Sequence, residues 1–227
     1  MDGTAELRDA LEREGVRVRF AAGQTLMHQG DPPTHVALLL SGAVKVVLHL
    51  PEGERLLLAV RGPGEILGVM GVLGAAPRSA TVVAALPCAV RVLAADRFRA
   101  LVRAEGEEAA LLRGALERLR EGERWRAETA TLPAVPRVAR ALLCLALPGD
   151  ADGPPVVVLS QSEIGAAVGM SRGAVAAELA RLRAAHLVDT AVRKVVLTDS
   201  AGLRALAGPG RRGVVSMTPR RPASRHG

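Results

Sequence analysis

The chain contains almost no aromatic side chains. Its 227 residues include two phenylalanines, one tryptophan and no tyrosine, although 49% of the residues are hydrophobic. A folded core must therefore be built mainly from alanine, valine and leucine. Proteins that bind single-stranded nucleic acid or RNA loops stack bases on exposed aromatic rings, so the composition argues against both of these partners.

Cysteine is equally scarce, and no set of residues has the spacing of a metal site. The two cysteines, Cys88 and Cys144, cannot ligate an iron–sulfur cluster or a four-cysteine zinc ion within one chain. Both lie in apolar stretches, LPCAV and LLCLA, and we expect two buried, reduced thiols. The scattered histidines are expected in ordinary structural or surface positions: His28, His35, His49 and His186.

Long apolar runs and an N-terminal signal sequence are also missing from the sequence. We therefore expect a cytoplasmic protein with no membrane partner. No nucleophile lies at a usable spacing from a base, so we expect neither catalytic residues nor enzymatic activity.

Positive charge is abundant but unevenly placed. The net charge is +7, and the tail after Gly208 supplies +5 of it through arginines without any acid. Residues 159–197 carry a net charge of only +2. The overall charge is thus weak evidence for nucleic-acid binding, and we expect residues 208–227 to form a basic, disordered tail.

The most informative segment is residues 159–187, which has the pattern of two short helices that meet at a glycine turn. Ser160 and Glu163 have the spacing of a capping box at the start of the first helix. Gly169 supplies the bend, and Ser171 can cap a second helix with apolar residues at helical spacing, Val175, Leu179 and Leu182. This unit places its second helix in the DNA major groove. We therefore predict a DNA-binding regulator with a recognition helix over about residues 171–185.

The rest of the chain predicts an α+β protein. Short apolar runs separated by glycines extend from Phe20 to about Arg91 and favour a β-sandwich or jelly roll. Asp96 can cap a helix, a longer helix follows over about 107–128, and the two prolines of Thr131–Pro136 predict a hinge. Further on we expect a helix over 137–146, a strand over 156–159, a wing hairpin over 187–190 and 194–197, and a last helix near Asp199.

These elements divide the chain into five predicted parts. They are an N-terminal helix with a β-domain (1–103), a long dimerisation helix (104–131), a hinge (132–136), a winged helix-turn-helix domain (137–207) and the tail (208–227).

Four small or apolar residues of the long helix repeat at coiled-coil spacing: Leu112, Ala115, Leu119 and Gly122. Because charged residues cover its other faces, we interpret this stripe as a homodimer seam. The alternative is that the stripe packs only on the β-domain of its own chain.

Several short motifs occur in an order and spacing that resemble one family. They are Gly23…Gln29-Gly30-Asp31, Leu40-Ser41-Gly42-Ala43-Val44, Gly64-Glu65-Ile66-Leu67-Gly68, Arg78-Ser79-Ala80 and Glu163-Ile164-Gly165…Val168-Gly169-Met170-Ser171-Arg172. Over residues 18–207 the chain resembles the family of the cyclic-AMP receptor protein and the fumarate–nitrate regulator. The resemblance implies a bacterial homodimeric transcription factor that binds two-fold-related DNA half-sites, responds to a ligand in its β-domain and works with RNA polymerase.

The resemblance also implies that residues 1–103 hold a β-domain of the cyclic-nucleotide-binding kind, with a ligand site. Arg78 and Ser79 match the family's phosphate-binding pair, and the segment Gly68, Val69, Met70 would offer backbone N–H groups to an anion. Val69, however, stands where the family has its ribose-binding carboxylate, and Gly122-Glu123 stands near its adenine-binding Thr-Ser pair. Three alternatives stay open: cyclic AMP, another phosphorylated small molecule, or no small ligand and no cofactor.

For DNA, the resemblance aligns the base-contacting positions with Arg172, Gly173 and Ala177. Arginine pairs with guanine through two hydrogen bonds, whereas glycine and alanine offer no polar group. Arg181 also faces the expected groove. The candidates for phosphate contacts are Ser162, Ser171, Arg193 and Lys194. The small groove-facing residues leave an alternative from another class, a ligand-sensing or protein-interaction module with a degenerate DNA reader.

Overall fold

The computed structural model describes residues 4–149 and 153–208. Most of the predicted tail, residues 209–227, lies outside the described residues. The N-terminal part consists of α1 (Ala5–Glu14), β1 (Val16–Phe20), β2 (Thr25–Met27), β3 (His35–Ser41), β4 (Val44–His49), β5 (Arg55–Arg61), β6 (Ile66–Leu67), α2 (Val69–Gly74), β7 (Thr81–Ala84), β8 (Cys88–Ala94) and α3 (Ala95–Glu105). The C-terminal part consists of α4 (Glu108–Thr131), α5 (Ala134–Leu145), β9 (Val156–Val157), α6 (Gln161–Val168), α7 (Arg172–Ala184), β10 (Val188–Ala191), β11 (Lys194–Leu197) and α8 (Ser200–Leu206).

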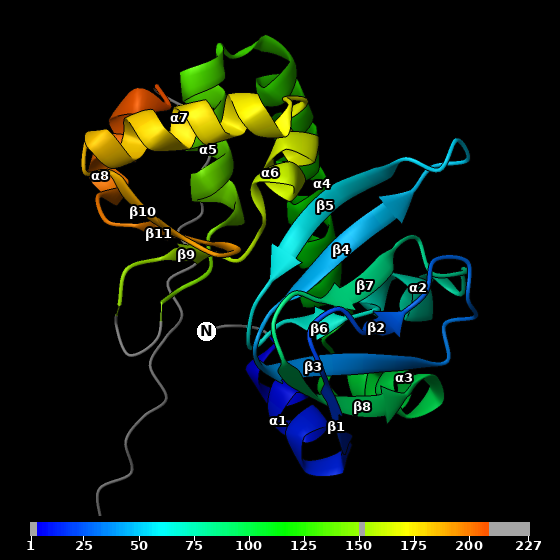
Figure 1. Cartoon of the computed structure of the whole chain (residues 1–227). Helices are drawn as coiled ribbons and strands as arrows, with labels where there is room; N and C mark the ends of the chain where they lie inside the picture. Colours follow the sequence, from blue (N-terminus) through cyan, green and yellow to red (C-terminus); the bar gives the residue numbers. More distant parts are fainter. Residues whose placement is uncertain (1–3, 150–152, 209–227) are drawn as a thin grey trace, which may run out of the picture.

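The N-terminal part is a β-sandwich, as the sequence predicts (Figure 1). Its two antiparallel sheets have the strand orders β1-β8-β3-β6 and β2-β7-β4-β5. Side chains from both sheets form a shared core that includes Met27, Leu39, Val44 and Val90. A second apolar cluster joins the first sheet to α1, α2 and α3, with Phe98 at 0% exposure. The α+β fold class is confirmed.

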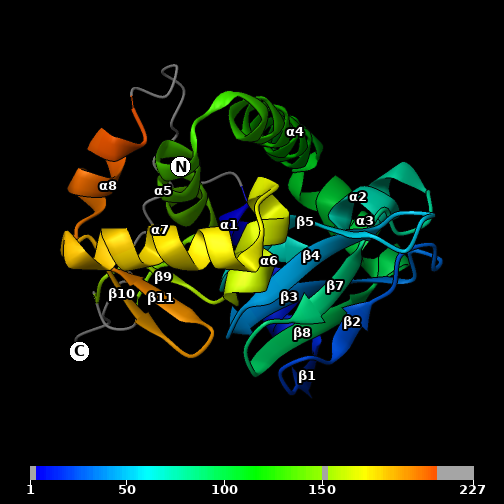
Figure 2. The same ribbon diagram turned by 45° about the horizontal axis from the view of Figure 1, so that its top comes forward.

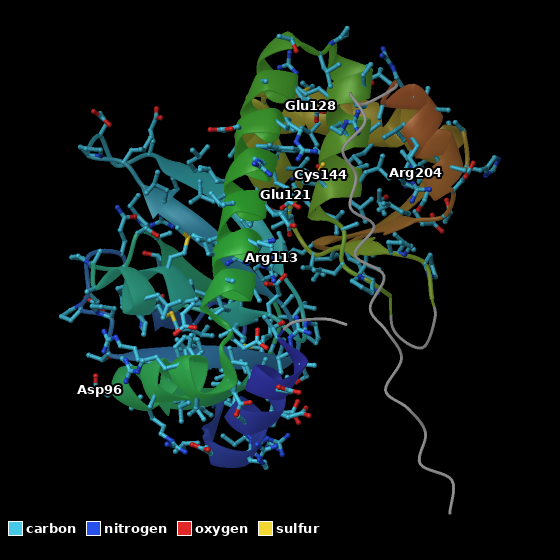
Figure 3. The ribbon with its side chains drawn as sticks, turned by 180° about the vertical axis from the view of Figure 1, so that it is seen from behind. Asp96, Arg113, Glu121, Glu128, Cys144 and Arg204 are labelled. Atoms are coloured by element: carbon cyan, nitrogen blue, oxygen red, sulfur yellow. The ribbon has the colours of Figure 1, made fainter. Side chains whose placement is uncertain are left out.

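Helix α4 runs along the outside of the molecule from the β-domain to the C-terminal domain (Figure 3). The predicted cap of the preceding helix is wrong, because α3 begins at Ala95 and Asp96 lies inside its first turn. There the carboxylate of Asp96 pairs with Arg99 at 2.7 Å. Near the C-terminal end of α4, the carboxylate of Glu128 lies 3.3 Å from Arg140 and ties this long helix to α5.

The predicted hinge over 132–136 is too long. Helix α5 begins at Ala134, so Pro136 belongs to its first turn and only Leu132 and Pro133 separate the two helices. A proline fits there because the first backbone N–H groups of a helix have no partner within it. The guanidinium of Arg137 donates from Nε (3.0 Å) and Nη2 (2.7 Å) to the carbonyl of Leu132 and braces this short link.

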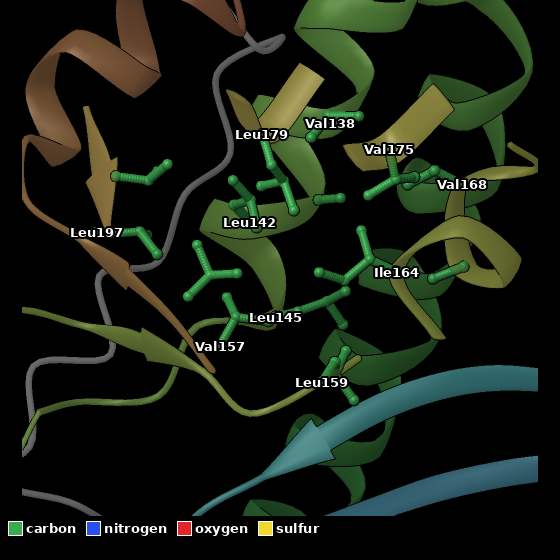
Figure 4. Packing of buried hydrophobic residues seen from close by; sticks show 14 of the residues in the cluster. Val138, Leu142, Leu145, Val157, Leu159, Ile164, Val168, Val175, Leu179 and Leu197 are labelled. Carbon is green, nitrogen blue, oxygen red and sulfur yellow. The ribbon is translucent and has the colours of Figure 1, made fainter. Parts of the chain in front are cut away.

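The C-terminal domain packs four helices on the small sheet β10-β11-β9 around one apolar core (Figure 4). The five residues that the sequence places on the inner faces of the two motif helices are all buried: Ile164, Val168, Val175, Leu179 and Leu182. Cys88 is buried as expected, but the expectation for Cys144 is wrong, because this residue is exposed. Helical periodicity turns Leu142 and Leu145 inward and leaves Cys144 between them on another face.

The two domains share an interface. Residues on the outer face of β2-β7-β4-β5, among them Leu57 and Val60, belong to the same buried cluster as the core of the C-terminal domain. Helix α6 lies against β5 in both views (Figures 1 and 2). No helix in the described part of the chain is long and apolar enough to cross a membrane.

Candidate nucleic-acid interface

The first motif helix begins as the sequence predicts. The Ser160 hydroxyl accepts from the backbone N–H of Glu163 at 3.2 Å, and the Glu163 carboxylate accepts from the backbone N–H of Ser160 at 2.8 Å. The helix ends at Gly169, whose φ of +65° lies in the left-handed region. Gly165 permits the close turn, because a Cβ there would lie 2.5 Å from the carbonyl oxygen of Met170.

The second motif helix, α7, presents a free face. Ser171 caps it by accepting from the backbone N–H of Ala174 at 3.2 Å. Opposite the buried face, four of the predicted groove-facing residues are exposed, Arg172, Gly173, Ala177 and Arg181, whereas a fifth, Ala176, is half-buried. Arg181 is held by Glu178 of the same helix at 3.2 Å, so its guanidinium is positioned by an i, i+3 ion pair.

Four of the predicted DNA contacts converge on one hollow. Ser162, Arg172, Arg193 and Lys194 line a space of about 290 Å³ between the start of α6, α7 and the wing. Ser171 is instead engaged as the cap of α7. A concave surface with three cations beside an exposed helix suits a polyanion, because arginine and lysine bind phosphate oxygens strongly.

The wing tip holds Arg193 in an unusual backbone conformation. Its φ of +54° lies in the left-handed region, which disfavours side chains other than glycine and asparagine. The Nη2 atom of Arg193 lies 3.3 Å from the Glu163 carboxylate. The strained turn thus carries an arginine, and this arginine points back to the start of α6.

The predicted ligand site in the β-domain is only partly assembled. Arg78 is 5% exposed. Its Nη1 donates to the carbonyl of Gly68 at 2.9 Å, and its Nη2 donates to the carbonyl of His35. Burial lowers the pKa of Arg78, and the nearby Asp31 carboxylate acts in the opposite direction. Glycine is favoured at 68, because its φ of +83° lies in the left-handed region, and a Cβ there would also lie 2.4 Å from Nη1 of Arg78.

The side chains of the other three predicted ligand residues differ in their exposure. Val69 is 6% exposed and packs in the cluster of α1, α2 and α3, Met70 is 60% exposed, and Ser79 is exposed. A ribose would find no acceptor in the Val69 side chain, and Gly122 offers no side chain to a base. Val69 and Gly122 therefore lack the polar side-chain contacts to ribose and base that the resemblance implies, while the backbone N–H groups of residues 68–70 stay a predicted anion site.

The predicted seam on α4 is exposed. Leu112 is 61% exposed and Leu119 is 56% exposed, while Ala115 and Gly122 are partly buried. Leu116, which sequence reasoning missed, is 44% exposed and lies one turn from both leucines. The alternative in which the whole stripe packs on the chain's own β-domain is therefore wrong for the two leucines.

A β-sandwich domain, a long helix with an exposed leucine face and a winged helix-turn-helix domain together define a two-domain DNA-binding regulator. The family model of the cyclic nucleotide-binding domain matches residues 17–105, and that of the Crp-like helix-turn-helix domain matches residues 136–206. The chain belongs to the CRP/FNR family of transcription regulators, as the motifs indicate.

Individual relatives span nearly the whole chain. A CRP-like cAMP-activated global transcriptional regulator of Mycobacterium tuberculosis is 30% identical over 201 residues, which cover 86% of this chain and 89% of that protein. A crystal structure of a CRP-family transcriptional regulator from Thermus thermophilus is 28% identical, with a TM-score of 0.64, and covers 84% of this chain and 96% of its own. The structure of a second CRP/FNR-family regulator from that organism is 26% identical, with a TM-score of 0.65. The match covers 86% of this chain and 100% of that chain.

Proposed function

We propose that the protein acts as a homodimer that places α7 of each protomer in the major groove of a two-fold-related operator. The observation that carries this proposal is the hollow beside the exposed face of α7, where Arg172 lies with Arg193 and Lys194 of the wing. Helix, wing and cations then meet one DNA duplex, and the winged domain docks as a rigid unit.

Within this interface the residues have different roles. Arg172 reads guanine through O6 and N7, which is worth about 1–3 kcal/mol of discrimination. Gly173 and Ala177 let the helix approach closely without selecting a base. Ser162, Arg193 and Lys194 bind phosphates and set the register, and Arg181, oriented by Glu178, adds a further cation.

The dimer forms through Leu112, Leu116 and Leu119 of α4, whose exposed side chains become buried against a second copy. RNA polymerase is the further partner that a transcription regulator requires, and the bacterial cytoplasm is the location that fits this role.

For the effector, the proposal departs from cyclic AMP. The guanidinium of Arg78 is tied to two backbone carbonyls, and Val69 packs in a helical core. Another phosphorylated small molecule that reaches the remaining N–H groups of Arg78, or no small ligand, are the two alternatives that we favour over cyclic AMP.

The test uses DNA selected by the purified protein from sheared genomic DNA. Arg172→Ala should weaken binding to the selected sequence about 10- to 100-fold, while binding to random DNA of the same length changes little. Lys194→Ala, the control, should weaken both, because it removes only a phosphate contact. Equal losses for Arg172→Ala would contradict its role as a base reader.

A protein-interaction module with a degenerate reader is the second candidate, favoured by the small side chains at 173 and 177. If no sequence is enriched over random DNA at any protein concentration, this candidate replaces the first.

A further inference from the structure

Glu163 joins three parts of the molecule that are far apart in the sequence. Its carboxylate pairs with Nζ of Lys45 on β4 and lies 3.3 Å from Nη2 of Arg193 at the wing tip. The same carboxylate accepts from the backbone N–H and the hydroxyl of Ser160, each at 2.8 Å. One side chain therefore connects the β-domain, the start of α6 and the wing.

Lys45 is placed where a cation needs a partner. It lies on β4, where it pairs with Val60 of β5 on one side and with Val83 of β7 on the other. Its side chain is 13% exposed. The apolar patch of Leu57 and Val60 on the same sheet packs into the core of the C-terminal domain. Removing a charge from water is costly unless an opposite charge compensates, and here the start of α6 supplies that charge.

The same contacts involve the DNA-binding surface. Glu163 and its neighbour Ser162 line a cleft of about 710 Å³ between α6 and the sheet β2-β7-β4-β5, which we call the outer sheet. Ser162 also lines the hollow of Arg172. While Glu163 accepts from Nη2 of Arg193, that nitrogen is engaged and the nearby carboxylate offsets part of the positive charge that a DNA phosphate would meet.

We propose that Lys45, Glu163 and Arg193 form an electrostatic latch that holds the DNA-binding domain on the outer sheet of the β-domain and withholds Arg193 from DNA. When the latch opens, the start of α6 leaves the sheet and Arg193 becomes free to bind phosphate. The effect on DNA rests on the proposed function, whereas the contact between the domains does not.

The latch has a reciprocal consequence. If its closed form lowers the affinity for DNA, then bound DNA must weaken the contact between Lys45 and Glu163 by the same factor. DNA binding would thus be transmitted to β4 and to the sheet that carries it. A signal that reaches this sheet would act on DNA binding through the same ion pair.

The experiment combines charge reversal with a matched control. Lys45→Glu opposes two carboxylates across the interface, and Glu163→Gln removes the acceptor charge while a glutamine still completes the capping box. Arg55→Glu makes the same change in net charge on the neighbouring strand β5. Arg55 lines the same cleft and forms no ion pair within the described ranges 4–149 and 153–208.

Two readouts are needed, hydrogen exchange of β5 without DNA and affinity for the selected DNA. Lys45→Glu should speed exchange in β5, the edge strand that α6 covers, and should raise DNA affinity about fivefold, which corresponds to about 1 kcal/mol. Arg55→Glu should leave exchange unchanged and should lower DNA affinity, because it only reduces positive charge. Adding Glu163→Gln to Lys45→Glu should restore exchange toward the wild-type rate.

The outcomes are distinct. Unchanged exchange in Lys45→Glu, or a loss of DNA affinity as large as that of Arg55→Glu, would overturn the latch. Faster exchange in Lys45→Glu that Glu163→Gln reverses would support the contact between domains even if neither the variants nor the wild type bind DNA. In that case the proposed function would fail and the interdomain contact would stand.

Discussion

Replacement of Leu119 by glutamate tests the dimer seam, and the structure sets the size of the effect. Leu112, Leu116 and Leu119 are 61%, 44% and 56% exposed, so each can still bury about half of its side chain. Full burial of a leucine is worth roughly 2 kcal/mol, so each of these contributes about 1 kcal/mol on association. Leu119→Glu removes two such contributions from a dimer, about 2 kcal/mol, which corresponds to about a thirtyfold weaker dimer.

The two glutamates would also face and repel each other across the seam, so we expect the dissociation constant of the dimer to rise by at least about thirtyfold. Sedimentation equilibrium over a range of protein concentrations measures the dissociation constant directly. Leu206→Glu is the control, because Leu206 is 40% exposed on α8, at the other side of the C-terminal domain from α4 (Figure 2). A Leu119→Glu variant that dimerises as tightly as the wild type, or a Leu206→Glu variant that dissociates to the same extent, would exclude the leucine face of α4 as the dimer seam.

The remaining predictions concern the ligand site, the latch and the tail. Arg78→Met should lower the free energy of unfolding by about 3 kcal/mol in urea without any ligand, because two buried carbonyls lose a charged donor; unchanged stability would show that Arg78 serves only a ligand. Cyclic AMP should leave the melting temperature of the wild-type protein unchanged, and a saturable increase would restore cyclic AMP as the effector. Burial alone would raise the pKa of Glu163, but hydrogen bonds from Lys45 and Ser160 together lower it, so its stabilising contribution is complete above the ordinary range of a glutamic acid and is lost as the pH falls through the folded-state pKa. Urea unfolding from neutral pH to about pH 3 should therefore show a smaller loss of stability in Glu163→Gln than in the wild type, whereas parallel curves would exclude this contribution. The cleft also holds His28, His49 and Arg55, whose charges are common to both proteins. Deletion of residues 209–227 should reduce the slope of log affinity for random DNA against log salt, because five arginines are removed; an unchanged slope would show that the tail does not contact DNA.

Local patterns predicted the DNA-binding motif well. The capping box of Ser160 and Glu163, the turn at Gly169 and the cap at Ser171 depend on residues within a few positions of each other. The periodicity of Val175, Leu179 and Leu182 correctly separated the buried face of α7 from its exposed face. Such features are accessible to sequence reasoning because the backbone geometry of a helix alone relates the residues involved.

Tertiary contacts were not accessible in the same way. The pair of Lys45 and Glu163 spans 118 positions, and no local pattern distinguishes this lysine from a solvated one. Arg78 matched a phosphate-binding position, yet its actual partners are carbonyls of Gly68 and His35, which carry no sequence signal. Pro136 suggested a hinge, although a first helical turn accommodates it equally well.

As proposed, the protein reads DNA as a symmetric dimer through Arg172. Footprinting of the wild-type protein on its selected genomic DNA tests this most directly. We expect two protected half-sites related by two-fold symmetry, with centres about 34–36 Å apart or a multiple of that spacing. In Arg172→Ala both should be lost at protein concentrations at which the wild type protects the site. A single asymmetric protected site, or the same footprint with Arg172→Ala, would contradict it.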